Sequence, residues 1–390
     1  DVWCEITHLG FQNTFNNRGM DWFRPIKKIE DAHKTRKNMP EVNEVFRYAF
    51  TDYPLEDYST GLITGQTVRF LHEHKDRPFS LWVSYPDPHS PYEAPRKYAE
   101  GFDLDSIQLP AWSSNEMDKA PEVNKILKQM MGIEECSEED IKKFLIAYYA
   151  MIKFIDDGIG RIMDTLLELR LFENTIVVFC ADHGDFAGEH AMVSKGGVFY
   201  DSLTHIPLIF YAPGTKRVNM IDDSMVNLID IVPTVLKLQG LDIPYHFQGV
   251  PLPTITERPP RDFVFSEYGA GGPAFTLEDA EKLPKLHGKQ ALLRTVQWRE
   301  AERRRKMVRS KQWKLVYDPL GGGNELYNVV EDPNEFCNLA DNPAYRETVE
   351  SLKNELLNWS IETEGGPVKT PLPDRDKYQI EKMSSYPYNS

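Results

Sequence analysis

A long stretch with helical periodicity, followed at once by an unbroken apolar run, constrains the fold of this chain most. Apolar side chains recur every three or four residues over 138–169, which predicts one long amphipathic helix. Its buried stripe is expected to comprise Leu145, Tyr149, Ile152, Ile155, Ile159, Ile162 and Leu166. The run 174–180 has no charged residue and is typical of a strand covered on both faces, with Cys180 as a buried apolar residue. This helix-to-strand order predicts an α/β fold.

Further apolar runs extend this pattern on both sides. Residues 79–85 and 206–211 are predicted strands, and 227–240 is a predicted helix that ends near Gly240. We expect 79–85, 174–180 and 206–211 to share one mostly parallel sheet sandwiched by helices. The segment 112–137 is interpreted as an acidic, loop-like insertion. Residues 1–252 are thus predicted to form an α/β core.

The pattern of predicted strands and helices changes after residue 252. A proline-rich connector at 252–260 precedes three short predicted strands, at 262–268, 306–310 and 313–317, the last two forming a hairpin. A helix is predicted at 347–362, and the tail from Gly365 is expected to be extended. Residues 253–390 therefore form a predicted C-terminal subdomain with a small antiparallel sheet, a helix and an extended tail.

Charge and cysteine content exclude several classes of function. The 390 residues carry 45 Lys and Arg against 60 Asp and Glu, a formal net charge of −15. Such a balance argues against nucleic-acid binding but allows a small anionic substrate in a locally basic pocket. No apolar run approaches the roughly 20 residues that span a membrane. The four cysteines lie far apart, which argues against a disulfide framework or a zinc site. No secretory signal is visible in the sequence, and the sequence does not identify the cellular compartment.

The sharpest motif follows the predicted strand 174–180. It reads Ala-Asp-His-Gly-Asp at 181–185, with Gly184 allowing a tight turn. Ligands of open α/β sheets bind beyond the carboxyl ends of the strands, where Asp182 and His183 would lie. A carboxylate beside an imidazole can form half of a divalent metal site. Alternatively, Asp182 caps the turn and His183 packs against it.

Two further residues are candidates for contacts with an anion. His89 lies in the loop Pro-Asp-Pro-His-Ser-Pro at 86–91, whose three prolines would preorganise a proton donor or anion contact. Alternatively, this loop is merely rigid and His89 bonds to the backbone. Lys195 precedes Gly196 and Gly197, and its ammonium could approach an oxyanion closely. By itself, Lys195 could equally be a solvated surface group.

Together these motifs resemble the sulfatase family of the alkaline-phosphatase superfamily. The matching segments are the metal-type motif at 181–185, Gly-Glu-His at 188–190, Lys195, Pro-His-Ser-Pro at 88–91, the helix segment 149–161, Asp-Ile-Val-Pro-Thr at 230–234 and the C-terminal hairpin region 313–340. The resemblance covers nearly the whole chain. It implies an alkaline-phosphatase-like α/β fold and hydrolysis of small anionic esters.

The resemblance also implies roles for individual residues. Asp182 and His183 would be two ligands of a divalent cation, usually Ca²⁺, with Mn²⁺ or Mg²⁺ as alternatives. His89 and Lys195 would hold sulfate oxygens, and either His89 or His205 would protonate the leaving group. Because His183 stands where many members carry asparagine, the chain is similar to the choline-sulfatase and phosphonate monoester hydrolase branch. Phosphodiester or phosphonate ester substrates are therefore an alternative to sulfate esters.

One family motif does not occur in this sequence. The family nucleophile is a formylglycine made from Cys or Ser in Cys/Ser-x-Pro/Ala-x-Arg, and neither this motif nor the paired aspartates of the family's first strand are found. We therefore expect the chain to begin after the nucleophile segment, with His8 as the family's nucleophile-supporting histidine. By itself the chain would hydrolyse neither aryl sulfates nor phosphate esters.

Three functions remain open from the sequence. The first is a sulfuric ester hydrolase with a divalent metal and a formylglycine nucleophile that is absent from this chain. The second is a phosphodiester or phosphonate monoester hydrolase of the same superfamily, and the third is a non-catalytic binding protein. For the first two, we expect Asp182, His183, His89 and Lys195 to converge on one pocket beyond the ends of the strands.

Overall fold

The computed structural model describes residues 34, 38–39, 47–215, 219–256, 258–269, 276–282 and 304–363. His8 and the predicted tail from Gly365 lie outside these residues. The chain forms two compact units, and each is described by itself below. Unit 1 comprises Asp1–Pro213 and Pro273–Glu302, and unit 2 comprises Gly214–Gly272 and Arg303–Ser390. The division into 1–252 and 253–390 stays a prediction.

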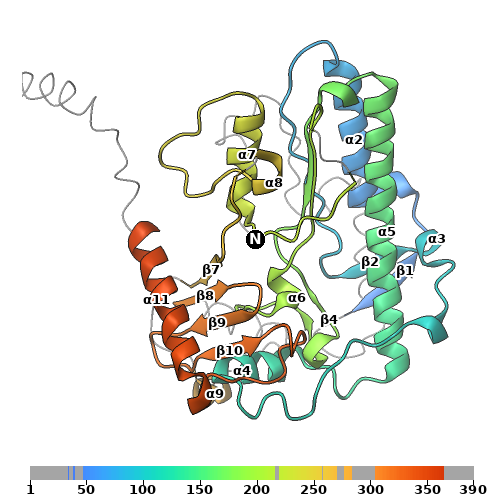
Figure 1. The fold of residues 1–390 in the computed structure, drawn as a ribbon. Helices are drawn as coiled ribbons and strands as arrows, with labels where there is room; N and C mark the ends of the chain where they lie inside the picture. The colour runs from blue at the N-terminus through green and yellow to red at the C-terminus, as the bar shows by residue number, and fades with distance from the viewer. Residues whose placement is uncertain are drawn as a thin grey trace, which may run out of the picture. The chain divides into compact units, whose positions relative to one another are not determined.

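Unit 1 is built around the predicted long helix, α5 (Glu138–Glu168), which packs beside α2 (Ser59–His74) (Figure 1). Ser137 caps α5 by accepting a hydrogen bond from the Asp140 backbone N–H at 3.1 Å, as helix N-termini favour. The buried face differs slightly from the expected stripe, because Tyr149 and Ile152 are 37% and 43% exposed. The shorter helices of this unit are α3 (Arg96–Ala99), α4 (Glu122–Met131), α6 (Asp201–Thr204) and α9 (Leu277–Glu281), with 3₁₀ helices η2 (Leu55–Asp57), η3 (Leu104–Ser106), η4 (Phe172–Asn174) and η5 (Glu189–Ala191).

The described strands of unit 1 form pairs. β1 (Tyr48–Thr51) pairs in parallel with β2 (Tyr92–Pro95). The pairs β3 (Val177–Cys180) with β6 (Leu208–Tyr211) and β4 (Phe186–Ala187) with β5 (Val193–Ser194) are antiparallel.

The predicted arrangement of the three apolar runs was wrong in detail. Residues 79–85 carry no strand, and Trp82 within them is 79% exposed. β3 and β6 are antiparallel, and the chain between them forms the β4–β5 hairpin and the short α6, where a parallel pair would need a crossover to the opposite end of the strand. Cys180 is exposed, contrary to the prediction, and the end of β3 that carries it is the exposed half of this strand.

The acidic segment 112–137, predicted to be a loop, contains helix α4. Val123, Ile126, Leu127 and Met131 of α4 are all at most 1% exposed. Their spacing of three and four residues is that of one helix face, so α4 is held by a single apolar stripe on an otherwise charged segment.

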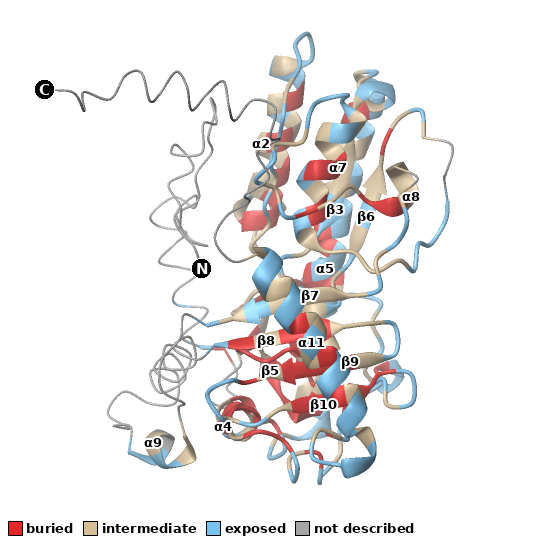
Figure 2. Cartoon of the chain, turned by 60° about the vertical axis from the view of Figure 1, so that its left-hand side comes forward, coloured by how far each residue is buried: buried red, intermediate tan, exposed pale blue. Residues whose placement is uncertain are grey.

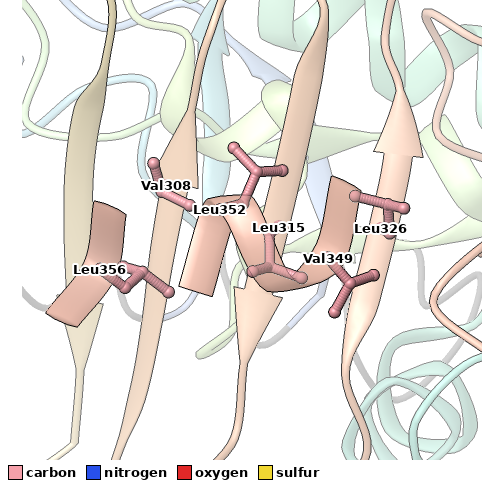
Figure 3. Packing of buried hydrophobic residues seen from close by; sticks show 6 residues of the cluster. All are labelled: Val308, Leu315, Leu326, Val349, Leu352 and Leu356. Carbon is pink, nitrogen blue, oxygen red and sulfur yellow. The ribbon is translucent and has the colours of Figure 1, made fainter. Parts of the chain in front are cut away.

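Unit 2 contains the predicted small antiparallel sheet. Its order is β10 (Glu325–Asn328), β9 (Trp313–Tyr317), β8 (Arg305–Arg309) and β7 (Val264–Tyr268), with β9 and β10 largely buried (Figure 2). Helix α11 (Arg346–Thr363) packs on this sheet through a core made of Val308, Leu315, Leu326, Val349, Leu352 and Leu356 (Figure 3). The hairpin and the terminal helix are therefore confirmed.

The predicted helix 227–240 is shorter than expected. It consists of a 3₁₀ turn, η6 (Leu228–Asp230), followed by α7 (Ile231–Leu238). Unit 2 also contains α8 (Pro253–Thr256) and the 3₁₀ helix η7 (Pro343–Tyr345). In the described part of the chain, no helix is both long and apolar enough to cross a membrane.

Candidate active site

Asp182 and His183 follow β3 directly, as the sequence predicts. The His183 backbone N–H donates to Asp182 Oδ1 at 2.9 Å, and His183 Nε2 lies 3.6 Å from Asp182 Oδ2. The Asp182 side chain is 88% exposed and that of His183 is 38% exposed. Asp182 therefore orients the residue next to it while its carboxylate stays open to a ligand.

Gly184 has a different role from the tight turn expected of it. Its backbone N–H donates to the Leu203 carbonyl at 2.9 Å. A Cβ at this position would collide with the carbonyl oxygen of Ser202, so only glycine allows α6 to approach the 181–185 loop this closely.

The Lys195 side chain contacts the His183 ring. Lys195 Nζ lies 2.9 Å from His183 Nε2, and His183 Nδ1 lies 2.7 Å from the Gly184 carbonyl oxygen. An ammonium group can only donate, so Nε2 accepts and Nδ1 carries the proton that is donated to Gly184. A metal-binding histidine commonly has this same tautomer, in which the other ring nitrogen donates to a backbone carbonyl.

His89 is held in its loop by backbone and side-chain contacts. His89 Nδ1 lies 2.6 Å from the Ser90 carbonyl oxygen, and the His89 backbone N–H donates to the Pro86 carbonyl at 3.1 Å. In the same loop, Asp87 Oδ2 accepts a hydrogen bond of 2.5 Å from Thr60 Oγ1 of α2. The loop is therefore attached to α2, and the Ser90 carbonyl fixes the His89 ring through Nδ1.

Asp185 interacts electrostatically with the predicted site residues, although the sequence analysis assigned it no role. Burial raises the pKa of Asp185, and interactions with Lys195, His183 and His89 oppose that rise. The charge of Asp182 adds to it, and the net pKa is raised. All four predicted residues thus lie within electrostatic range of one shielded carboxyl group. The signal that could have found it is a second carboxylate three positions after Asp182.

The other predicted site residues are less informative. His205 is exposed at the end of α6, where its backbone N–H donates to the Asp201 carbonyl at 2.9 Å. Within the described ranges, no group of three or more His, Cys, Asp or Glu side chains could hold a metal ion. Asp182 and His183 still suit a divalent cation as two ligands, because one offers an open carboxylate and the other the required tautomer.

Comparison with known proteins assigns the chain to a family. The candidate ligands Asp182 and His183 lie on a loop that directly follows a strand of an α/β unit. The sequence matches the family model described as Sulfatase over residues 4–241, so this chain belongs to the sulfatase family.

Individual relatives agree with this assignment. The chain is 26% identical over 307 residues to the arylsulfatase of Clostridium perfringens, covering 77% of this chain and 57% of that protein. The chain thus spans little more than half the length of the curated relatives that it matches first.

Solved structures with the same fold include a phosphonate monoester hydrolase and a protein solved in complex with a sulfated sugar. Phosphonate monoester hydrolase from Silicibacter pomeroyi has a TM-score of 0.68 at 22% identity, covering 85% of this chain and 68% of that chain. A protein solved with its substrate D-glucosamine-2-N,6-O-disulfate has a TM-score of 0.56 at 19% identity, covering 80% of this chain and 72% of that chain. These likenesses confirm the predicted α/β fold class.

Proposed function

We propose that this protein is a sulfatase-type hydrolase that acts on a small sulfate ester. The contact of Lys195 Nζ with His183 Nε2 at 2.9 Å, directly beyond β3, is the observation that carries the proposal. It sets a cation beside a metal-type Asp-His pair in a chain whose formal net charge is −15. A cation at this position can contact an anionic ester although the chain as a whole is negative. Membership of the sulfatase family supports the same reaction.

Asp182 and His183 would hold the divalent cation, with Ca²⁺ as the first candidate and Mn²⁺ or Mg²⁺ as alternatives. When bound, the cation would stabilise negative charge on the ester oxygens. The Gly184 carbonyl keeps the proton of His183 on Nδ1, which leaves the Nε2 lone pair for the cation. Lys195, now in contact with Nε2, would turn to a sulfate oxygen and neutralise part of its charge.

His89 is the proposed general acid. Since the Ser90 carbonyl can only accept, His89 Nδ1 carries a proton in the contact of 2.6 Å. When the imidazole is charged, Nε2 carries the second proton and can donate it to the leaving oxygen. His205 is the second candidate for this step.

The nucleophile in this proposal is the formylglycine that the family resemblance implies, with His8 supporting it. The sequence contains no Cys/Ser-x-Pro/Ala-x-Arg motif for its formation. The experiment therefore uses the product of the natural gene, made together with a formylglycine-generating enzyme.

The test compares hydrolysis of 4-nitrophenyl sulfate with Ca²⁺, Mn²⁺, Mg²⁺ or a chelator. We expect metal-dependent turnover, which Lys195→Ala lowers by about 10²–10³-fold because one preorganised positive donor is lost. Lys143→Ala is the matched control, since Lys143 pairs with Glu139 on an exposed turn of α5. Absence of turnover, or equal rates for both lysine variants, would exclude this mechanism. Binding of the ester without turnover would favour a non-catalytic binding protein.

A phosphonate monoester or phosphodiester is the second candidate substrate. His183 in the second position of the Asp-His pair favours it, as the resemblance to the phosphonate monoester hydrolase branch implies. Turnover of 4-nitrophenyl phenylphosphonate, measured beside the sulfate ester on the same preparation, separates the two. A higher kcat/KM for the phosphonate would replace the sulfate ester as the proposed substrate.

A further inference from the structure

The segment 188–194, which comprises the turn between β4 and β5 together with β5, has an unusual backbone. Gly188, His190, Ala191 and Ser194 have positive φ angles of 115°, 55°, 47° and 69°. Left-handed backbone costs a non-glycine residue about 1–2 kcal/mol, so such residues persist only where surrounding contacts hold them. This turn separates His183 from Lys195 along the chain, and its shape decides whether the two side chains meet.

Buried charges hold the middle of this turn. Glu116 Oε2 lies 3.3 Å from His190 Nδ1, and Glu116 Oε1 lies 3.4 Å from Lys128 Nζ of α4. Lys128 Nζ also donates to the His190 carbonyl oxygen. The Glu116, His190 and Lys128 side chains are only 2%, 4% and 13% exposed. Lys128 Nζ also lies 2.9 Å from Glu134 Oε1, so removal of Glu116 deprives chiefly His190 of its carboxylate partner, and breaking such a buried pair is destabilising.

Packing from α4 reaches both sides of the same turn. The Tyr200 ring stacks on His190 with centroids 3.9 Å apart, and Asn124 Nδ2 of α4 donates to the Tyr200 hydroxyl at 2.8 Å. Directly after Lys195, a Cβ on Gly196 would come within 2.6 Å of a Leu127 methyl group. Helix α4 thus contacts the chain both before and after the hairpin strand that leads to Lys195.

We propose that Glu116, Lys128 and His190, here called the α4 clamp, are positioning residues for Lys195. The clamp holds the left-handed turn and thereby presents Lys195 Nζ to His183 Nε2. A role of this Lys195 position in catalysis rests on the proposed function, whereas the effect of the clamp on the position of Lys195 does not.

The test measures Lys195 directly and needs no turnover. Competitive acylation with acetic anhydride, followed by mass spectrometry, reports the reactivity of the Lys195 amine, and hydrogen exchange reports opening of residues 188–194. In Glu116→Gln we expect faster acylation of Lys195 and exchange in 188–194 that is faster by about tenfold or more, because the turn opens locally. Glu335→Gln is the matched control, since it breaks a buried pair with Lys314 (side chains 2% and 0% exposed) in unit 2.

Two further measurements keep the proposal testable if the Glu116→Gln variant does not fold. Lys128→Met leaves the Glu116–His190 pair in place and should show smaller changes of the same sign. In the unaltered protein, amides of 188–194 should be as protected as those of α4. The proposal is overturned if a folded clamp variant matches the unaltered protein in both readouts, if Glu335→Gln changes Lys195 equally, or if the unaltered turn lacks protection. If the clamp variants alter Lys195 reactivity but the unaltered protein hydrolyses no ester, the proposal about the α4 clamp stands and the proposed function is rejected.

Discussion

Replacing Gly158 of α5 with alanine tests how closely α5 approaches α2. A Cβ at Gly158 would lie 2.6 Å from Thr64 Oγ1 and 3.4 Å from the Tyr85 hydroxyl oxygen. Thr64 is fully buried, its hydroxyl donates to the Thr60 carbonyl at 2.8 Å, and it lies 3.0 Å from the Tyr85 hydroxyl. The Thr64 side chain therefore cannot rotate away without losing hydrogen bonds.

Gly160, two residues further along the same helix, is the matched control. It is exposed, and nothing lies within 4 Å of a Cβ built there. Alanine in a helix is favoured over glycine by about 0.8–1.0 kcal/mol, so Gly160→Ala should stabilise the protein by that amount. At Gly158 the same gain is opposed by overpacking that costs about 1–3 kcal/mol and by a strained hydrogen bond that contributes about 1 kcal/mol. Gly158→Ala should therefore destabilise by about 1–3 kcal/mol.

Thermal unfolding followed by far-UV circular dichroism provides the measurement. A unit of this size changes its Tm by about 2–4 °C per kcal/mol, so the two variants, about 2–4 kcal/mol apart, should differ by about 4–16 °C. Urea midpoints at equal m-values would give the same order. If Gly158→Ala is as stable as Gly160→Ala, the helices are not in the close contact described and the reasoning fails.

Two other perturbations test unit 2 and the α4 clamp. Leu315→Ala removes a side chain with no exposed surface from the sheet–helix core, and should cost about 2–5 kcal/mol in urea unfolding, whereas Leu357→Ala, at a position 57% exposed, should change stability by less than about 0.5 kcal/mol. Burial would raise the pKa of Glu116, but hydrogen bonding to His190 and the charges of His190 and Lys128 outweigh it, so the pKa lies below its ordinary value of 4.5. This contribution to stability is present above pH 4.5 and is lost as the pH falls through the lowered pKa. Urea midpoints of Glu116→Gln should accordingly fall less on acidification than those of the unaltered protein, and equal slopes would contradict the prediction.

Elements with strong local signals were predicted well. Helix α5 begins and ends within one residue of the range 138–169, because its apolar period and the Ser137 cap both lie in the local sequence. The hairpin of β8 and β9 and the terminal helix α11 follow the same rule. Helix α4 was missed because ten residues with a single apolar stripe give little local signal among acidic loop residues.

Strand pairing and the site depended on contacts that sequence periodicity does not specify. An apolar run such as 79–85 shows that a segment can form a strand, but a strand exists only where a partner supplies hydrogen bonds. In the same way, the Asp-His motif and Lys195 could be recognised as candidates, whereas their distance is decided by the turn at 188–194 and by α4.

The amino-acid sequence thus determined the long helix, the C-terminal hairpin and the chemical types of residue that follow β3, because these depend on neighbours along the chain. Only the tertiary structure decided that His183 and Lys195 touch, that Asp185 is shielded among them, and that Glu116 reaches His190 from a position 74 residues away. Buried charges and left-handed backbone are unfavourable by themselves. They are stable only where distant segments close around them, and no local pattern encodes that closure.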